Sequence, residues 1–136
     1  MAAKSATLRW TGEDLRFDAD GYGGPSLSID SSSTSGPSPM DALLIGVAGC
    51  MAIDVLMIAQ KSRVQIDGLT VDVEGDRVET DPKRFEKIRL VYRVEGASEE
   101  DEPKLQRAVD LSREKYCSVL HSLRTDIDLD IRIERS

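Results

Sequence analysis

Aromatic residues are scarce in this chain of 136 residues, at 4% of the total, and it contains only 2 cysteines and 1 histidine. A core must therefore be built from Leu, Ile, Val, Ala and Met, and the apolar fraction of 40% is large enough for one. Two cysteines do not make a disulfide framework, and a chain of this length needs none because folding buries about two thirds of its surface. The composition predicts one globular domain over residues 1–136.

Positive charge is also in short supply, with 18 Lys and Arg against 25 Asp and Glu and a net charge of -7. Nucleic acids and anionic membrane surfaces bind proteins that cluster Lys and Arg. The charge balance therefore predicts that the chain has neither a nucleic-acid partner nor a membrane partner.

The longest apolar stretch without a charge is short. It covers the twelve residues between Asp41 and Asp54, whereas a membrane-spanning helix needs about 20. The N-terminal segment MAAKSATLRW has no apolar core of the kind that a secretory signal carries. We expect a cytoplasmic protein of bacterial type, whose two cysteines are reduced or redox-active thiols rather than a permanent bridge.

Nucleotide-binding and hydrolase motifs are absent from the sequence. It contains no phosphate-binding glycine loop, no dinucleotide fingerprint and no G-x-S-x-G segment. We therefore expect no bound cofactor.

Apolar periodicity predicts an α+β fold. Residues that alternate between apolar and polar with period two indicate strands. The first three strands are predicted to form a meander, and the next two an antiparallel pair with one solvent-exposed face. The predicted strands cover residues 6–10, 15–17, 27–29, 69–79, 85–94 and 127–133. Helices are predicted at residues 39–63 and 105–111, with a second short helix after residue 115.

The helix predicted at 39–63 is the most informative element. Ser38 and Pro39 are suited to the N-cap and the first helical position. Apolar residues surround the helix on all sides, so we expect it to be buried all round. Its small residues Gly46, Ala48 and Gly49 permit close approach of another backbone, either a sheet or a partner subunit.

Cys50 lies within this helix, and Cys117 lies 67 positions later near the start of the second short helix. Both could be small apolar packing residues, because free cysteine is often buried. Three features favour reactive thiols instead: small neighbours around Cys50, Lys115 close to Cys117, and a polar residue one turn after each cysteine.

Those polar residues permit a different hypothesis. Asp54 follows Cys50 and His121 follows Cys117 at i+4 spacing. Cys50, Asp54, Cys117 and His121 together are an acceptable set of zinc ligands. Because zinc sites more often contain closely spaced cysteine pairs, our primary expectation is that no metal is bound.

Two segments far apart in the chain resemble the OsmC/Ohr family of bacterial thiol peroxidases. They are GPSPMDALLIGVAGCMAIDVLMIAQKS and LSREKYCSVLHSL, and the likeness extends over nearly the whole chain. The resemblance implies an OsmC-like α+β fold with antiparallel sheets around a long buried central helix, in an intertwined homodimer. It also implies reduction of organic hydroperoxides in oxidative or osmotic stress defence, with Cys50 as peroxidatic cysteine, Cys117 as resolving cysteine and a dithiol as reductant.

Members of this family carry a glutamate ten residues before the peroxidatic cysteine and an arginine from an early strand. Here Met40 is at the glutamate position and Asp41 follows it, which is similar to the OsmC-like subgroup. The resemblance suggests Asp41 as the acid that activates the thiolate, and Arg9 or Arg16 as the arginine. Leu43, Leu44, Val47 and Met51 are expected to line the substrate site or to pack in the core.

A protein with the same fold could also function without catalysing a reaction. In that alternative the protein binds a small hydrophobic ligand, and the cysteines are packing residues or a redox sensor. Consumption of peroxide with a dithiol reductant distinguishes the two hypotheses.

Overall fold

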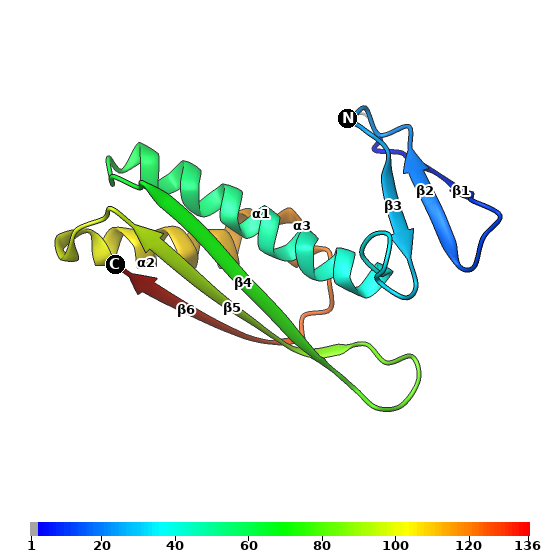
Figure 1. Cartoon of the computed structure of the whole chain (residues 1–136). Helices are drawn as coiled ribbons and strands as arrows, with labels where there is room; N and C mark the ends of the chain where they lie inside the picture. The colour runs from blue at the N-terminus through cyan, green and yellow to red at the C-terminus, as the bar shows by residue number, and fades with distance from the viewer. Residues whose placement is uncertain (1–2) are drawn as a thin grey trace. The chain divides into compact units, whose positions relative to one another are not determined.

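The computed structural model describes residues 3–136 and shows an α+β chain. The chain forms two compact units, one up to Leu43 and the other from Leu44 to Ser136. The long helix α1 (Pro39–Lys61) begins in the first unit and continues in the second (Figure 1).

The first unit contains an antiparallel meander in the order β1-β2-β3, as predicted. Its strands are β1 (Thr7–Trp10), β2 (Arg16–Asp20) and β3 (Leu27–Asp30). Apolar side chains of this small sheet stay exposed, including Leu8 and Trp10 at 56% and 62%. The sheet has too few apolar residues to bury them on its own.

The start of α1 is fixed by hydrogen bonds in both directions. The backbone N–H of Asp41 donates to the Ser38 hydroxyl at 3.1 Å, and the backbone N–H of Ser38 donates to the Asp41 carboxylate at 3.0 Å. This is a capping box, and it confirms Ser38 as the N-cap.

The helix ends two residues before the predicted boundary, at Lys61. Arg63 adopts a left-handed conformation with φ 62°, and the N–H of Val64 donates to the carbonyl of Ala59 at 3.0 Å. This is the Schellman geometry that terminates helices. Because the left-handed position holds arginine rather than glycine, the usual sequence signal for the end was missing.

The second unit contains a sheet in the order β4-β5-β6. Strands β4 (Gly68–Arg77) and β5 (Phe85–Glu95) pair antiparallel, as predicted, with the charged residues of β4 on the exposed face. Strand β6 (Asp128–Arg135) pairs with β5 in parallel, so the prediction that the sheets are antiparallel throughout is wrong for this pair. The helical connection between β5 and β6 is long enough for the crossover that a parallel pair requires.

Helical turns fill that connection. The short turn Glu99–Asp101 leads into α2 (Glu102–Leu111), and a π-helical turn at Ser112–Tyr116 leads into α3 (Ser118–His121). The acidic run after Gly96 is thus the start of a helix, where carboxylates interact favourably with the positive end of the helix dipole.

The core of the second unit lies between α1, the sheet and α2. A stripe of α1 with i+4 spacing is buried, and one end of it joins a cluster with residues of β5 and α2. The buried cluster consists of Ala59, Val64, Val94, Ala97 and Leu105.

The prediction that α1 is buried all round is not met within one chain. A second stripe of α1 is open to solvent, with Ile45, Ile53 and Met57 exposed at 59%, 61% and 50%. By length and composition α1 could also cross a membrane, but core helices of soluble proteins pass the same test. Ile45 and Ile53 of this stripe line a groove beside the sheet, and Met57 lines a separate cavity, both of which are described below.

Candidate functional site

The structure brings the two cysteines together. Cys50 lies on α1 and Cys117 lies at the N-cap of α3, and their sulfur atoms are within 4.8 Å of each other. Both cysteines are free thiols; Cys117 is fully buried and Cys50 is half-buried. A disulfide between them requires the sulfurs to approach to about 2.05 Å.

The backbone around Cys117 directs hydrogen-bond donors toward both sulfurs. Cys117 leaves the π-helical turn in an extended conformation, so its sulfur accepts the N–H of Leu120 at 3.3 Å. The N–H of Val119 donates to the sulfur of Cys50, and the Ser118 hydroxyl lies 3.9 Å from it.

These contacts make the two thiols unequal. Burial raises the pKa of Cys50, but hydrogen bonds from Val119, Cys117 and Ser118 outweigh burial, and the pKa falls below that of an ordinary thiol. Burial also raises the pKa of Cys117 to about 11, because its hydrogen bond to Cys50 and the nearby charges of Cys50 and Asp54 add to the effect. Cys50 is therefore the more acidic thiol of the pair, and Cys117 is the less acidic thiol that donates to it.

Asp54 is the third member of the cluster. One of its carboxylate oxygens lies within 4.8 Å of both sulfurs, and the buried Ser112 hydroxyl donates to Oδ2 at 2.9 Å. The Tyr92 hydroxyl on β5 is buried and has no hydrogen-bond partner within residues 3–136. Burial raises the pKa of Tyr92, and the charges of Cys117, Asp54 and Cys50 raise it further.

The donor set of a metal site is only partly assembled. Cys50, Asp54 and Cys117 offer three donor atoms within 4.8 Å of one another. His121, the fourth ligand of the zinc hypothesis, is not part of this group, since its Nε2 lies 3.0 Å from the carbonyl oxygen of Arg113. The described cluster is thus a pair of thiols with one carboxylate.

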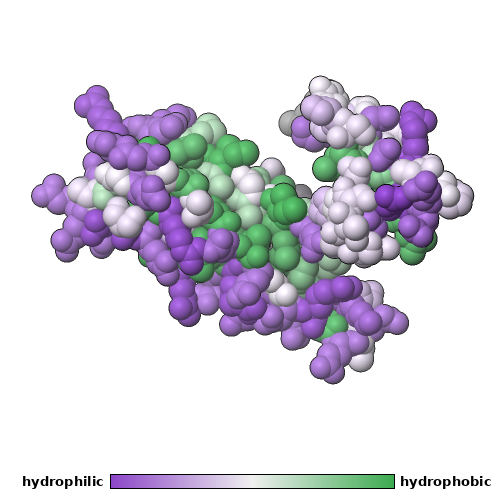
Figure 2. Space-filling view, viewed as in Figure 1, coloured by the Kyte–Doolittle hydropathy of each residue, from purple (hydrophilic) through white to green (hydrophobic). Residues whose placement is uncertain are grey.

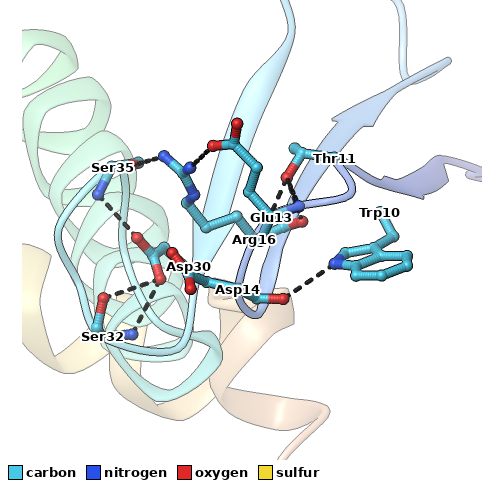
Figure 3. A network of polar contacts seen from close by, with 8 residues as sticks. All are labelled: Trp10, Thr11, Glu13, Asp14, Arg16, Asp30, Ser32 and Ser35. Carbon is cyan, nitrogen blue, oxygen red and sulfur yellow. Dashed lines mark hydrogen bonds and ion pairs between the residues drawn. The ribbon is translucent and has the colours of Figure 1, made fainter.

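The remaining residues suggested by the sequence belong to the first unit, where they have local partners. Arg9 pairs with Asp20 at 3.5 Å. Arg16 pairs with Glu13 and donates to Ser35 at 2.9 Å, as Figure 3 shows. The buried carboxylate of Asp30 accepts hydrogen bonds from Ser32 and Ser35 in the same network.

Asp41 accepts the Ser33 hydroxyl at 2.6 Å besides its capping contacts with Ser38. These hydrogen bonds hold the pKa of Asp41 below its usual range. The role of Asp41, Arg9 or Arg16 toward Cys50 stays a prediction.

A cavity of about 300 Å³ opens at Asp54. Its other walls are Met57, Ile58, Lys61 and Tyr116, and Lys115 places its amine 5.3 Å from the centre of the Tyr116 ring. Lys115 thus contacts an aromatic face, and it is not among the groups that lower the pKa of Cys50.

Two residues expected near the substrate belong to the core instead. Val47 and Met51 have no exposed surface, so the core alternative applies to them. The contributions of Ser112, Tyr92 and the Val119 amide carried no sequence signal, because each depends on how distant elements pack.

Comparison with known proteins identifies the fold. The sequence model described as OsmC-like protein matches residues 31–132. Protein YhfA of Escherichia coli K12 is 37% identical over 125 residues, which is 91% of this chain and 92% of that protein.

Solved structures of other proteins share the fold of this chain. The crystal structure of a hypothetical protein from Aquifex aeolicus VF5 matches with a TM-score of 0.89 and 31% identity, over 100% of this chain and 98% of that one. The organic hydroperoxide resistance protein OhrB of Bacillus subtilis shares the fold at a TM-score of 0.60 and 21% identity, over 99% and 98% of the two chains. The chain therefore belongs to the OsmC-like protein family, whose structural neighbours include organic hydroperoxide resistance proteins.

Proposed function

We propose that this protein is a thiol peroxidase that reduces organic hydroperoxides, with Cys50 as the peroxidatic cysteine and Cys117 as the resolving cysteine. The observation that carries the proposal is the unequal thiol pair: two sulfurs within 4.8 Å, one with a lowered and one with a raised pKa. The cysteine that attacks the peroxide must be a thiolate, whereas the resolving cysteine can remain a protonated thiol until the second step.

The reaction proceeds in three balanced steps. The Cys50 thiolate attacks the O–O bond of the hydroperoxide, becomes a sulfenic acid and releases an alcohol once the alkoxide takes up a proton. The Cys117 sulfur then forms an S–S bond with Cys50 and the hydroxyl leaves as water. A dithiol reductant restores both thiols by exchange.

The similarity to proteins named for organic hydroperoxide resistance supports this choice of substrate and a role in stress defence. The cavity beside Asp54, with Met57, Ile58 and Tyr116 in its walls, suits the organic part of such a substrate. The cytoplasm, where dithiol reductants are maintained, is the proposed location.

We also propose that the protein works as a homodimer in which residues 1–136 act as one domain. An apolar groove of about 480 Å³ runs between α1 and β4 and is visible as hydrophobic surface in Figure 2. Its lining includes Ile45, Gly49 and Ile53 of α1, and a Cβ on Gly49 would meet nothing within 4 Å. A second copy covering this groove would make the interface large, above about 2,000 Å² as in obligate dimers.

In that assembly Asp41 and one of the arginines, Arg9 or Arg16, are proposed to orient the thiolate of Cys50. No cation is among the groups that lower the pKa of Cys50 within the described part of the chain. An arginine brought to the site would lower that pKa further.

The test is turnover of cumene hydroperoxide with dithiothreitol by the wild-type protein. The variants Cys50→Ser and Cys117→Ser, each with one thiol, and the doubly substituted protein give the background. We expect turnover only in the wild type, and a sulfenic acid that a dimedone probe traps in Cys117→Ser but not in Cys50→Ser. Equal peroxide consumption by wild type and the double variant would refute the proposal.

The groove supports one other function, binding of a small hydrophobic ligand without catalysis. Its volume falls within the range of small-molecule sites. If the wild type does not consume peroxide, displacement of a fluorescent apolar probe by lipids tests this function.

A further inference from the structure

We propose that Asp54 is the general base of the resolving step, which takes the proton of the Cys117 thiol and passes it to the hydroxyl that leaves Cys50. This inference rests on the proposed function and deepens it. It assigns a role to a residue of α1 that the first chemical step does not use.

The resolving step needs a proton acceptor. Burial is the largest cause of the raised pKa of Cys117 and persists after Cys50 is oxidised, so near neutral pH the Cys117 sulfur carries a proton that must leave as the S–S bond forms. The departing hydroxyl needs a proton at the same time, because hydroxide is a poor leaving group. A base that exchanges one proton between these two atoms serves both needs.

Asp54 is placed for this exchange. One turn of helix separates it from Cys50, and one of its oxygens lies within 4.8 Å of both sulfurs, a span that a direct contact or one water can bridge. The buried Ser112 hydroxyl donates to Oδ2 at 2.9 Å and fixes the carboxylate in that position. Within residues 3–136 no other carboxylate shares this arrangement with the two thiols.

The other titratable groups near Asp54 are less suited. Tyr92 on β5 has a raised pKa, which keeps its hydroxyl protonated. Lys61 of α1 and Tyr116 share the cavity at Asp54, and neither lies in the thiol cluster. His121 has its Nε2 on the carbonyl of Arg113.

The step balances in atoms and electrons. The Cys117 sulfur attacks the Cys50 sulfur, the S–S bond forms and the S–O bond breaks. The thiol proton moves to an oxygen of Asp54 and then to the leaving hydroxyl, which departs as water. Asp54 ends as a carboxylate, and no external acid or base is consumed.

The charge of Asp54 has opposite effects on the two chemical steps. A carboxylate beside Cys50 raises the pKa of that thiol and so opposes the first step. The two steps therefore respond to the charge of Asp54 in opposite directions, which makes the role measurable.

The experiment follows the two steps separately in the full-length protein. Sulfenic acid formation and disulfide formation are measured after one equivalent of cumene hydroperoxide, in wild type, Asp54→Asn and Asp110→Asn. Asp110 is a matched control, since it is a helical carboxylate that accepts one hydrogen bond from a neutral side chain, Gln106, at 2.9 Å.

In Asp54→Asn we expect sulfenic acid to form at least as fast as in wild type, and the disulfide to form about 100-fold more slowly. The slow step should accelerate about tenfold per pH unit up to the pKa of Cys117, whereas in wild type it should depend weakly on pH. Disulfide formation at the wild-type rate, or equal slowing of both steps, would overturn the proposal.

A second measurement separates this inference from the peroxidase proposal. Ellman's reagent converts Cys50 to a mixed disulfide, and Cys117 must still lose its proton to displace thionitrobenzoate. Asp54→Asn should slow this displacement, and wild type should show a normal solvent isotope effect in deuterium oxide. If peroxide does not react but displacement depends on Asp54, only the peroxidase proposal fails; if neither effect is seen, the role of Asp54 is refuted.

Discussion

Replacing Cys117 tests how the site stabilises the Cys50 thiolate. The Cys117 thiol donates to the Cys50 sulfur, together with the Val119 amide and Ser118. Cys117→Ala removes that donor without adding a charge, whereas Cys117→Ser keeps a hydroxyl that can donate. The two variants therefore differ mainly in one hydrogen bond.

The size of the effect follows from the energy of that bond. A hydrogen bond to a charged group contributes about 1.5–3 kcal/mol. Because a thiol is a weak donor, we assign about 1.4 kcal/mol to the hydrogen bond from Cys117 to Cys50. One pKa unit corresponds to about 1.4 kcal/mol. The bond lowers the pKa of Cys50 because it favours the thiolate, so its loss in Cys117→Ala should raise this pKa by about one unit.

The assay is the rate of alkylation of Cys50 by iodoacetamide as a function of pH. Below the pKa the rate is proportional to the thiolate fraction, so near pH 7 Cys117→Ala should react about tenfold more slowly than wild type. Cys117→Ser should lie between the two. A pKa of Cys50 that is unchanged in Cys117→Ala, or faster alkylation of Cys117 than of Cys50 in wild type, would refute the reasoning.

Three further predictions concern assembly and stability. Ile53→Glu puts a charge on the exposed apolar stripe of α1, and analytical ultracentrifugation should show monomers where wild type is dimeric; a dimer of unchanged affinity would place the interface elsewhere. Tyr92→Phe removes a buried hydroxyl without a partner in the described chain, so urea unfolding should show about 1 kcal/mol more stability, and a loss of stability would mean that the hydroxyl is satisfied. Leu105→Ala opens a cavity in the buried cluster and should lower the free energy of unfolding by about 2–5 kcal/mol; a smaller loss would mean that the cluster collapses around it.

Much of the fold follows from local patterns in the sequence. Period-two alternation located each strand, and the apolar run after Pro39 located α1. The parallel pairing of β6 was not predicted, because alternation fixes which face a residue occupies and not which neighbour the strand takes. The open stripe of α1 leaves cover by a partner subunit a prediction, since an apolar surface does not say whether the same chain covers it.

The candidate site was predictable only in part. The spacing of Cys50 and Asp54 on one helix face indicated a shared surface, and their proximity to Cys117 agrees with it. His121 was expected beside Cys117 by the same rule, and its N–H does donate to the Cys117 carbonyl at 3.0 Å, but its ring lies 3.0 Å from the carbonyl of Arg113 and does not join the thiols. The amides of Val119 and Leu120 act through backbone geometry, which side-chain identity does not reveal.

In the proposed reaction, the arrangement of charge at the thiols affects the two chemical steps differently. Within the described chain, donors with no net charge stabilise the Cys50 thiolate, and the nearby Asp54 opposes it. The first step is therefore slower than an adjacent cation would make it. If Asp54 accelerates the second step, the sulfenic acid of Cys50 is short-lived, and further oxidation to sulfinic acid has little time to occur. Asp54→Asn should then accumulate sulfinic acid at Cys50 under excess peroxide, which mass spectrometry of the intact protein would detect, and equal accumulation in wild type would contradict this account.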